Sequence, residues 1–287
     1  MKTSDHMNIK EWTVRLLDTA ATLVKVMLLS RVPGKAGKEG RGRRIVVMGN
    51  GPSLRQTIDR DFNLLMGCDR MAVNFAANAP EFRKLRPSHY ILADPHFFRG
   101  YESDGNVRAL WSNLMAVDWP MTLHLPAGSR GRVPEGVSLS SSVRVRTYNL
   151  TPGEGFGAVV YPLFDAGLAM PRPRNVMIPA IMESIRDGYQ DITLVGADHT
   201  WHQSLWVDEE NRVVSVQPHF YKEGSGEQAR VRSEYAGYHL HDIFRSMMIA
   251  FRSYHEIAGY ASSRGVKIYN ATPGSMIDAF PRRALES

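Results

Sequence analysis

The chain has 287 residues, enough to bury one large α/β core or two smaller ones. Its hydrophobic content of 43% and charged content of 22% are ordinary for a globular protein. A formal net charge of +6 favours anionic partners such as nucleotides, acidic lipids or nucleic acid. The single cysteine, Cys68, excludes an internal disulfide and fits the reducing cytosol. The sequence contains no run of about 20 uncharged apolar residues, so no transmembrane helix is expected.

Residues 7–31 have the periodicity of an amphipathic helix. Its apolar face comprises Ile9, Trp12, Leu16, Leu23, Val26 and Met27. Its polar stripe comprises Lys10, Glu11, Arg15, Asp18, Thr22 and Lys25. Residues 32–43 are rich in glycine and positive charge, which predicts a flexible basic linker. Such a helix suits peripheral contact with an anionic membrane, on its inner cytoplasmic face. The alternative is packing on the domain or on a second subunit of a homo-oligomer.

Residues 44–287 alternate short apolar strands with helices. The predicted strands are Arg44–Gly49, Arg70–Asn74, His89–Asp94, Met121–Leu125, Val143–Tyr148, Ile192–Gly196 and Val266–Asn270. The clearest helices are expected at Asn175–Asp187 and Glu234–Ser263. This alternation predicts an α/β fold with a mostly parallel sheet covered on both faces. A polar stretch at about 199–233 interrupts the pattern, and a long irregular insertion of this kind is typical of a lid.

The predicted strands end in amides and carboxylates. The residues concerned are Asn50, Asn74, Asp94, Asp198 and Asn270. Because the carboxyl ends of parallel strands share one edge of a sheet, and ligands of open α/β sheets bind there, we expect a binding cleft at this edge. Amides and carboxylates suit ribose hydroxyls and base edges. Each also has a simpler explanation, since Asn and Asp are common in turns and caps.

The first strand runs into the glycine turn Gly49-Asn50-Gly51-Pro52-Ser53. The two glycines allow the backbone to approach a ligand closely, and Pro52 fits the first position of a helix. Ser53 and the amides after it would then form an anion site at the helix N-terminus. The turn lacks the Gly-Lys-Ser/Thr of a Walker A loop and the third glycine of a dinucleotide fingerprint.

The sequence contains no set of side chains with the spacing of a metal site, and we expect no metal or other cofactor. Asp59 and Asp61 fall after the first turn on a solvated surface, away from a strand end. The histidine pairs at 199/202 and 239/241 lie on different segments without cysteine support. Histidine is nevertheless the natural general base at neutral pH, and His219 in the insertion, beside Tyr221, is the candidate. The alternative is that His219 only packs within the lid.

An ordered series of motifs resembles the bacterial sialyltransferases that decorate lipooligosaccharides and the related motility-associated-factor glycosyltransferases. The series comprises "GNGPSL", "VNFAANAPEF", "DPHFF", "GYQDITLVGAD" and "GVKIYNATPGSMIDAF", spanning about residues 44–280. The resemblance implies a Rossmann-like variant of the GT-A glycosyltransferase fold with a flexible lid. It further implies metal-independent, inverting transfer from a CMP-activated sugar to a bacterial surface glycan or lipid-linked glycan.

The resemblance also implies roles for individual residues. Asn50 and Asn74 would bind the donor nucleotide and its phosphate, and His219 would be the general base. Asp94 stands where the family has a donor-binding asparagine. Asn175 falls near a donor-binding serine, and Arg172 near an arginine of the family.

Two departures from the family pattern bear on the donor. The positions of two lid tyrosines that contact the leaving phosphate fall near Thr200 and Trp206, which leaves Tyr221, His199, His202 or Lys222 for that role. A carboxylate at Asp94 is unfavourable beside an anionic donor, so it is expected to contact a ribose or sugar hydroxyl. Sialic acid, another nonulosonic acid and Kdo therefore all stay open as the transferred sugar.

Two other functions compete with glycosyl transfer. One is phosphoryl or pyrophosphoryl transfer to a small alcohol, which would need a divalent metal. The other is a non-catalytic nucleotide- or RNA-binding protein. Nucleic acid is not the expected partner, because the basic residues are scattered and lack an interleaved aromatic platform.

Overall fold

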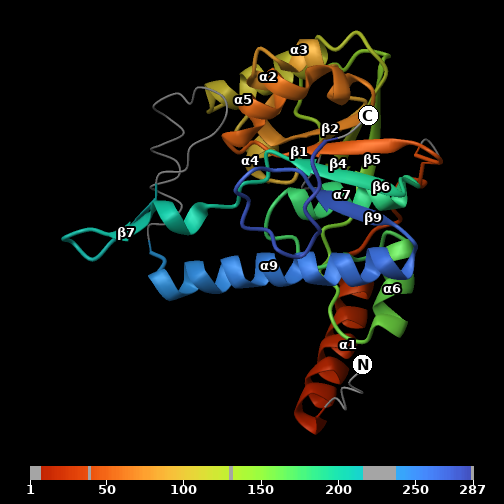
Figure 1. Cartoon of the computed structure of the whole chain (residues 1–287), viewed down its shortest axis with the longest axis vertical. Helices are drawn as coiled ribbons and strands as arrows, with labels where there is room; N and C mark the ends of the chain where they lie inside the picture. The colour runs from red at the N-terminus through yellow and green to blue at the C-terminus, as the bar shows by residue number, and fades with distance from the viewer. Residues whose placement is uncertain (1–7, 38–39, 129–131, 216–236, 286–287) are drawn as a thin grey trace.

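The computed structural model describes residues 8–37, 40–128, 132–215 and 237–285. Within these ranges a seven-stranded sheet has the order β5-β4-β3-β2-β1-β6-β9, and all its neighbouring strands are parallel (Figure 1). The strands are β1 Arg44–Met48, β2 Asp69–Val73, β3 His89–Ile91, β4 Met121–Pro126, β5 Val143–Tyr148, β6 Asp191–Val195 and β9 Lys267–Asn270. All seven predicted strands are confirmed: Val143–Tyr148 matches β5 at both ends, and the other six differ by one to three residues at a boundary.

Helices cover both faces of this sheet. One face packs on α2 (Ser53–Met66), the 3-10 helix η1 (Asn74–Asn78), α3 (Phe82–Leu85) and α5 (Gly105–Met115). The other packs on α6 (Gly157–Asp165), α7 (Met177–Arg186) and α9 (Leu240–Ser263). The short helix α4 (His96–Arg99) follows β3. The α/β class with a mostly parallel, doubly covered sheet is therefore confirmed.

The first strand shows why the sheet is buried on both sides. Ile45 and Val47 face the α7 side, whereas Val46 and Met48 face the α2 side, and all four are at most 2% exposed. A strand with no solvent face has no polar alternation, which is why "RIVVM" reads as a continuous apolar run.

The order of the strands reverses beside β1. The chain builds outward from β1 to β5, then crosses back to place β6 on the other side of β1. The ends of β1 and β6 thus form the topological switch point, where open α/β sheets bind their ligands.

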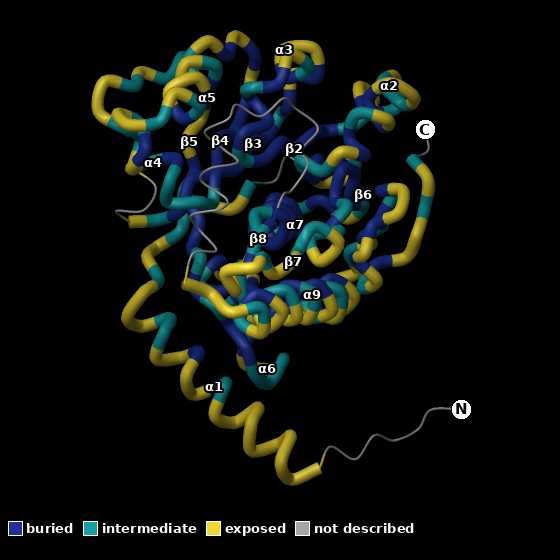
Figure 2. Tube along the Cα trace, turned by 90° about the vertical axis from the view of Figure 1, so that its left-hand side faces the viewer, coloured by how far each residue is buried: buried dark blue, intermediate teal, exposed yellow. Residues whose placement is uncertain are grey.

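Helix α1 (Ile9–Leu29) projects from the body of the molecule (Figures 1 and 2). The side of the helix that carries Thr19 and Thr22 faces the domain. The Thr22 hydroxyl donates to the Glu154 carbonyl at 2.8 Å, and the Thr19 hydroxyl accepts from the Phe156 amide at 2.9 Å. Of the residues predicted for the apolar face, Trp12 contacts the Phe156 ring and Val26 packs against the core, whereas the others are exposed, with Ile9 85% exposed.

The residues predicted to form a flexible linker are held against the body where the structure describes them. The Gly34 amide donates to the Thr147 carbonyl at 3.1 Å, and the Gly37 amide donates to the Asp187 carboxylate at 3.1 Å. Gly40 packs so closely on Tyr189 that a Cβ there would lie 2.5 Å from its backbone nitrogen. In this segment glycine therefore allows close packing against neighbouring residues, in addition to giving the backbone conformational freedom.

The predicted lid begins with a 3-10 helix, η3 (Trp201–Ser204), followed by an antiparallel pair formed by β7 (Leu205–Val207) and β8 (Val213–Ser215). The rest of the insertion, including His219 and Tyr221, lies outside the described residues.

Candidate functional site

The turn after β1 is pressed against the end of β6. The Gly49 amide donates to the Val195 carbonyl at 2.8 Å, and the Gly51 amide donates to the Gly196 carbonyl at 2.9 Å. A Cβ on Gly49 would lie 2.4 Å from the Gly196 oxygen, closer than real side-chain atoms approach a carbonyl. The glycines at these positions thus allow two strand ends to meet at the switch point.

The N-terminus of α2 contacts a carboxylate of the protein itself, the side chain of Asp198. The Ser53 hydroxyl donates to Asp198 Oδ2 at 2.7 Å, and the Ser53 amide points to Asp198 Oδ1 at 3.3 Å. The amides of Gly51 and Ser53 thus have partners within the protein, and Pro52 has no N–H, whereas the phosphate contact expected at this turn stays a prediction. Asp198 and Ser53 instead fix the turn to β6 and favour the helix through its dipole.

Asn50 and Asn74 lie side by side at the ends of β1 and β2. The Asn50 Nδ2 donates to the carbonyl of Val73, the residue before Asn74, at 3.1 Å. The side-chain oxygens of both asparagines are buried, and neither accepts a hydrogen bond from the described residues. Asn74 also has a left-handed backbone, with φ of 48°, which asparagine tolerates better than most residues. Two buried acceptors without donors are unfavourable unless a ligand donates to them.

A hydrogen-bonded chain follows β6 and links it to α7 and α9. The Tyr254 hydroxyl donates to Asn175 Oδ1 at 2.9 Å, and this oxygen also accepts from the Met177 amide at 3.0 Å. Since the hydroxyl proton is committed there, His199 Nε2, 2.6 Å away, is the donor to the tyrosine oxygen. Burial lowers the pKa of His199 to about 3, so this imidazole is neutral at physiological pH. The Asn175 Nδ2 is buried and has no acceptor among the described residues.

The end of β3 carries a histidine–aspartate pair that the sequence did not reveal. His96 Nε2 lies 2.8 Å from Asp104 Oδ2. Burial alone would raise the pKa of the Asp104 carboxyl, but the hydrogen bonds from His96 and the Asn106 amide outweigh it and lower that pKa. Asp94 caps α4 by accepting from the His96 amide at 2.8 Å. The eight-residue spacing of the pair matches no common motif, so only the folded loop reveals it.

Asn270 ends β9 as predicted, but the fold itself uses its side chain. It is 1% exposed, and its Nδ2 donates to the Ser275 hydroxyl at 3.0 Å and to the Ile277 carbonyl at 3.2 Å. Its Oδ1 accepts from the Thr272 amide at 3.0 Å. The side chain is thus fully engaged in shaping the loop after β9.

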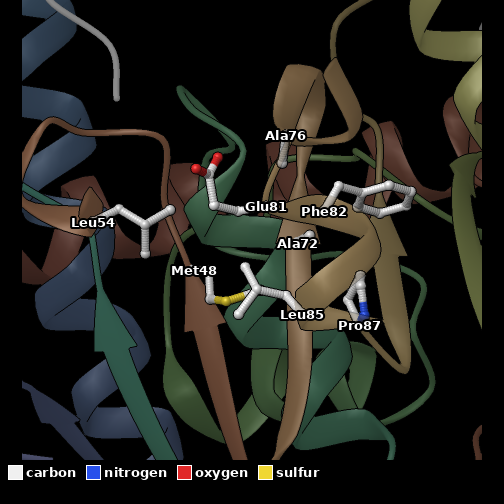
Figure 3. Close-up of a pocket in the computed structure, with 8 residues that line it drawn as sticks. All are labelled: Met48, Leu54, Ala72, Ala76, Glu81, Phe82, Leu85 and Pro87. Carbon is white, nitrogen blue, oxygen red and sulfur yellow. The ribbon is translucent and has the colours of Figure 1, made fainter. Parts of the chain in front are cut away.

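A small apolar pocket lies near the carboxyl edge, on the face of the sheet that α2 and α3 cover (Figure 3). Its lining residues are Met48, Leu54, Ala72, Ala76, Glu81, Phe82, Leu85 and Pro87. The only charged one, Glu81, forms an ion pair with Arg55. This lining suits an apolar group and offers little to a sugar or phosphate.

The structure therefore brings together Gly49, Asn50, Gly51, Ser53 and Asp198 at the switch point, with Asn74 adjoining them. Asn175 is linked to this edge by hydrogen bonds through Tyr254 to His199, the residue after Asp198. Arg172 is engaged elsewhere, since its Nε donates to Glu154 Oε2 at 3.1 Å.

No protein-family model matches the chain, and no curated protein does. Its fold is similar to the structure of the MAf glycosyltransferase from Magnetospirillum magneticum AMB-1, with a TM-score of 0.50 and 14% sequence identity. The match covers 96% of this chain and 39% of that one, so this chain spans about two fifths of the length of its structural neighbour. At this identity the likeness establishes a shared α/β fold.

Proposed function

We propose that this protein is a glycosyltransferase-type enzyme that uses a nucleotide-activated sugar. The proposal rests on a group of buried amide atoms at the carboxyl edge that have no hydrogen-bond partner among the described residues: the oxygens of Asn50 and Asn74 and the nitrogen of Asn175. A nucleotide offers donors and acceptors to such atoms through its base edge and ribose hydroxyls. The fold shared with a glycosyltransferase supports the same class.

The finer proposal is metal-independent, inverting transfer from a CMP-linked nonulosonic acid or Kdo to a surface-glycan acceptor. It rests on the motif resemblance and on His219 as the general base. Because the turn amides are engaged, the donor phosphate would contact the Asn50 side chain rather than the N-terminus of α2. This differs from the arrangement expected from the turn alone.

A thermal-shift screen of CMP, UDP, GDP and ADP tests the nucleotide class. A ligand that binds the native state raises the melting temperature by mass action, and CMP is expected to do so. Asn74→Gly removes the amide but keeps the left-handed backbone, so it should abolish the shift. Asn63→Ala, on an exposed position of α2, is the matched control and should preserve it. A shift by UDP alone, or a full CMP shift in Asn74→Gly, would contradict the proposal.

Turnover measurements test the general base. His219→Ala should lower the rate about 10²–10⁴-fold while donor binding persists, because a general base contributes about this much. His241→Ala, at an exposed histidine of α9, is the control and should leave the rate unchanged. A near wild-type rate for His219→Ala would remove this residue from the mechanism.

We further propose that α1 rests on an anionic membrane surface. Its outward face is apolar, with Leu17 64% and Met27 74% exposed, and basic residues flank it at Lys10 and Lys25. None of the helices in the described ranges is both long enough and apolar enough to span a bilayer. Leu17→Asp combined with Met27→Asp should abolish co-sedimentation with phosphatidylglycerol vesicles. If the same variant instead converts a dimer to a monomer and sedimentation is unaffected, a second subunit covers this face.

A further inference from the structure

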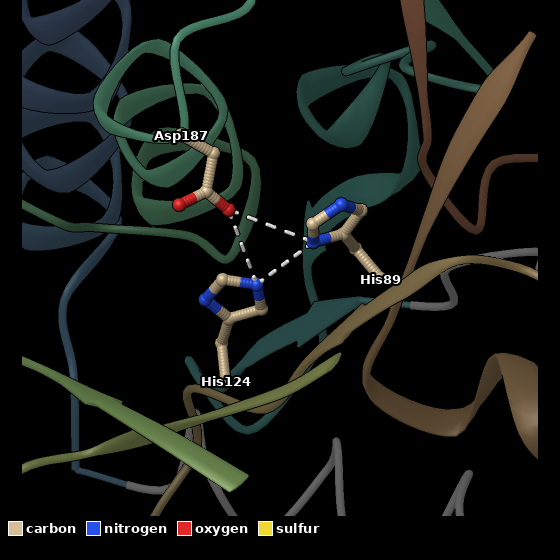
Figure 4. A group of neighbouring side chains, drawn as sticks. All are labelled: His89, His124 and Asp187. Carbon is tan, nitrogen blue, oxygen red and sulfur yellow. Dashed lines mark hydrogen bonds and ion pairs between the residues drawn. The ribbon is translucent and has the colours of Figure 1, made fainter. Parts of the chain in front are cut away.

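A buried polar cluster lies between the sheet and the end of α7, away from the carboxyl-edge residues. His89 is the first residue of β3, His124 lies in β4, and Asp187 directly follows α7 (Figure 4). Their exposed fractions are 3%, 0% and 0%. Both histidines face the α7 side of the sheet, because their strand neighbours Tyr90 and Leu123 belong to the core on the α2 side. The proposed glycosyl transfer assigns this cluster no role.

Three side-chain atoms converge at its centre. His89 Nδ1 lies 3.1 Å from His124 Nε2 and 3.6 Å from Asp187 Oδ2, and the latter two atoms are 3.8 Å apart. The circle through three points with these separations has a radius of about 2.0 Å, which matches zinc–nitrogen and zinc–oxygen bond lengths. A single ion at its centre would thus reach all three ligands without moving the backbone.

The carboxylate of Asp187 is oriented for such an ion. Its Oδ1 accepts from the Gly37 amide at 3.1 Å and pairs with Arg146. Its Oδ2 is buried, has no hydrogen-bond donor among the described residues, and points to both imidazoles. An anionic oxygen in this position gains most from a cation.

The surroundings also fix the protonation of His89. The Tyr189 hydroxyl donates its proton to Asp69 Oδ2 at 2.6 Å. His89 Nε2, 3.1 Å from the same hydroxyl, must then be the donor, which leaves the lone pair of its Nδ1 directed to the centre.

A carboxylate also stands behind the second imidazole. Glu183 Oε2 lies 3.6 Å from His124 Nδ1. Carboxylates are common partners of the second ring nitrogen of histidine ligands in zinc sites, where they set the tautomer and raise the basicity of the ligand.

We propose that His89, His124 and Asp187 form a structural site for one divalent ion of the zinc class. Two imidazoles and one carboxylate suit zinc better than magnesium or calcium, which prefer all-oxygen sites. Binding uses the lone pairs of His89 Nδ1 and His124 Nε2, so a neutral His124 would carry its single proton on Nδ1, which faces Glu183 Oε2. The ion joins β3, β4 and the end of α7.

Metal stoichiometry tests the site. The purified full-length chain is equilibrated with Zn²⁺, freed of excess ion and analysed by mass spectrometry for zinc per chain. Wild type should retain about one equivalent. His124→Gln and Asp187→Asn, both close in shape to the native residues, should lose it. His241→Gln is the matched control, because it alters an exposed histidine beside Asp242 and should retain the ion. Wild type without stoichiometric zinc, or loss only in His241→Gln, would overturn the proposal.

X-ray absorption at the zinc edge of the wild-type protein makes the test independent of variant folding. Two imidazole nitrogens with oxygen as the remaining ligand are expected. Sulfur, or three or more imidazoles, in the first coordination shell would assign the ion elsewhere and refute the site. Either result leaves the proposed glycosyl transfer unaffected, since the two proposals use different residues.

Discussion

The buried imidazole of His199 should make the stability of this protein depend on pH in a defined window. Its pKa in the folded protein is about 3, against about 6.5 in an unfolded chain. Between these values the unfolded state binds the extra proton and the folded state does not, so stability falls as the pH falls below about 6.5. At about pH 5 the unfolded state gains about 2 kcal/mol from protonating this residue, and above about pH 7 it gains almost nothing.

Urea unfolding of wild type and His199→Gln at about pH 5 and pH 7 measures this effect. The variant loses hydrogen bonding to Tyr254 at both pH values, so only the difference in pH dependence is informative. Other titrating groups contribute to both proteins and cancel. Wild type should lose about 2 kcal/mol more than the variant on acidification. Equal losses would refute the argument that His199 is buried in its neutral form.

Two substitutions test the switch point through thermal unfolding. Gly49→Ala should destabilise the protein by about 3 kcal/mol or more, because the new methyl group would lie 2.4 Å from the Gly196 carbonyl oxygen. Gly105→Ala is the control: its methyl group would have no neighbour nearer than 3.8 Å, so it should leave the stability unchanged or raise it. Equal effects of the two substitutions would count against the close approach of Gly49 to Gly196. Asp198→Ala should cost about 2 kcal/mol, because the Ser53 hydroxyl and amide lose a charged acceptor, and an unchanged melting temperature would show that this cap contributes little.

The inner strands were predictable because burial on both faces leaves a continuous apolar run, as in β1. The sequence also placed Asn50, Asn74 and Asp198 correctly at one edge, since a parallel sheet aligns its strand ends. What it did not predict is the bonding among them. Whether the N-terminus of α2 contacts a ligand or the Asp198 side chain depends on how closely the ends of β1 and β6 approach each other. That distance is set by the tertiary structure and cannot be predicted from local sequence.

The histidines show the same limit in another form. Sequence spacing directed attention to neighbours such as His199 and His202, whereas the buried cluster joins His89 and His124, 35 residues apart, through the register of β3 and β4. Local spacing carries no information on such pairs. Helix periodicity likewise identified both faces of α1 but not which one the domain would take.

The way α1 attaches has a practical consequence for handling the domain. Its docking surface combines hydrogen bonds of Thr19 and Thr22 to backbone groups at 154–156 with apolar contacts of Trp12 and Val26. A chain shortened to begin after α1 would therefore expose more of the Phe156 ring and a small apolar area of the core. It would also lose half of the large hydrophobic residues that are exposed in the described part of the chain, so we expect it to associate less than the full chain.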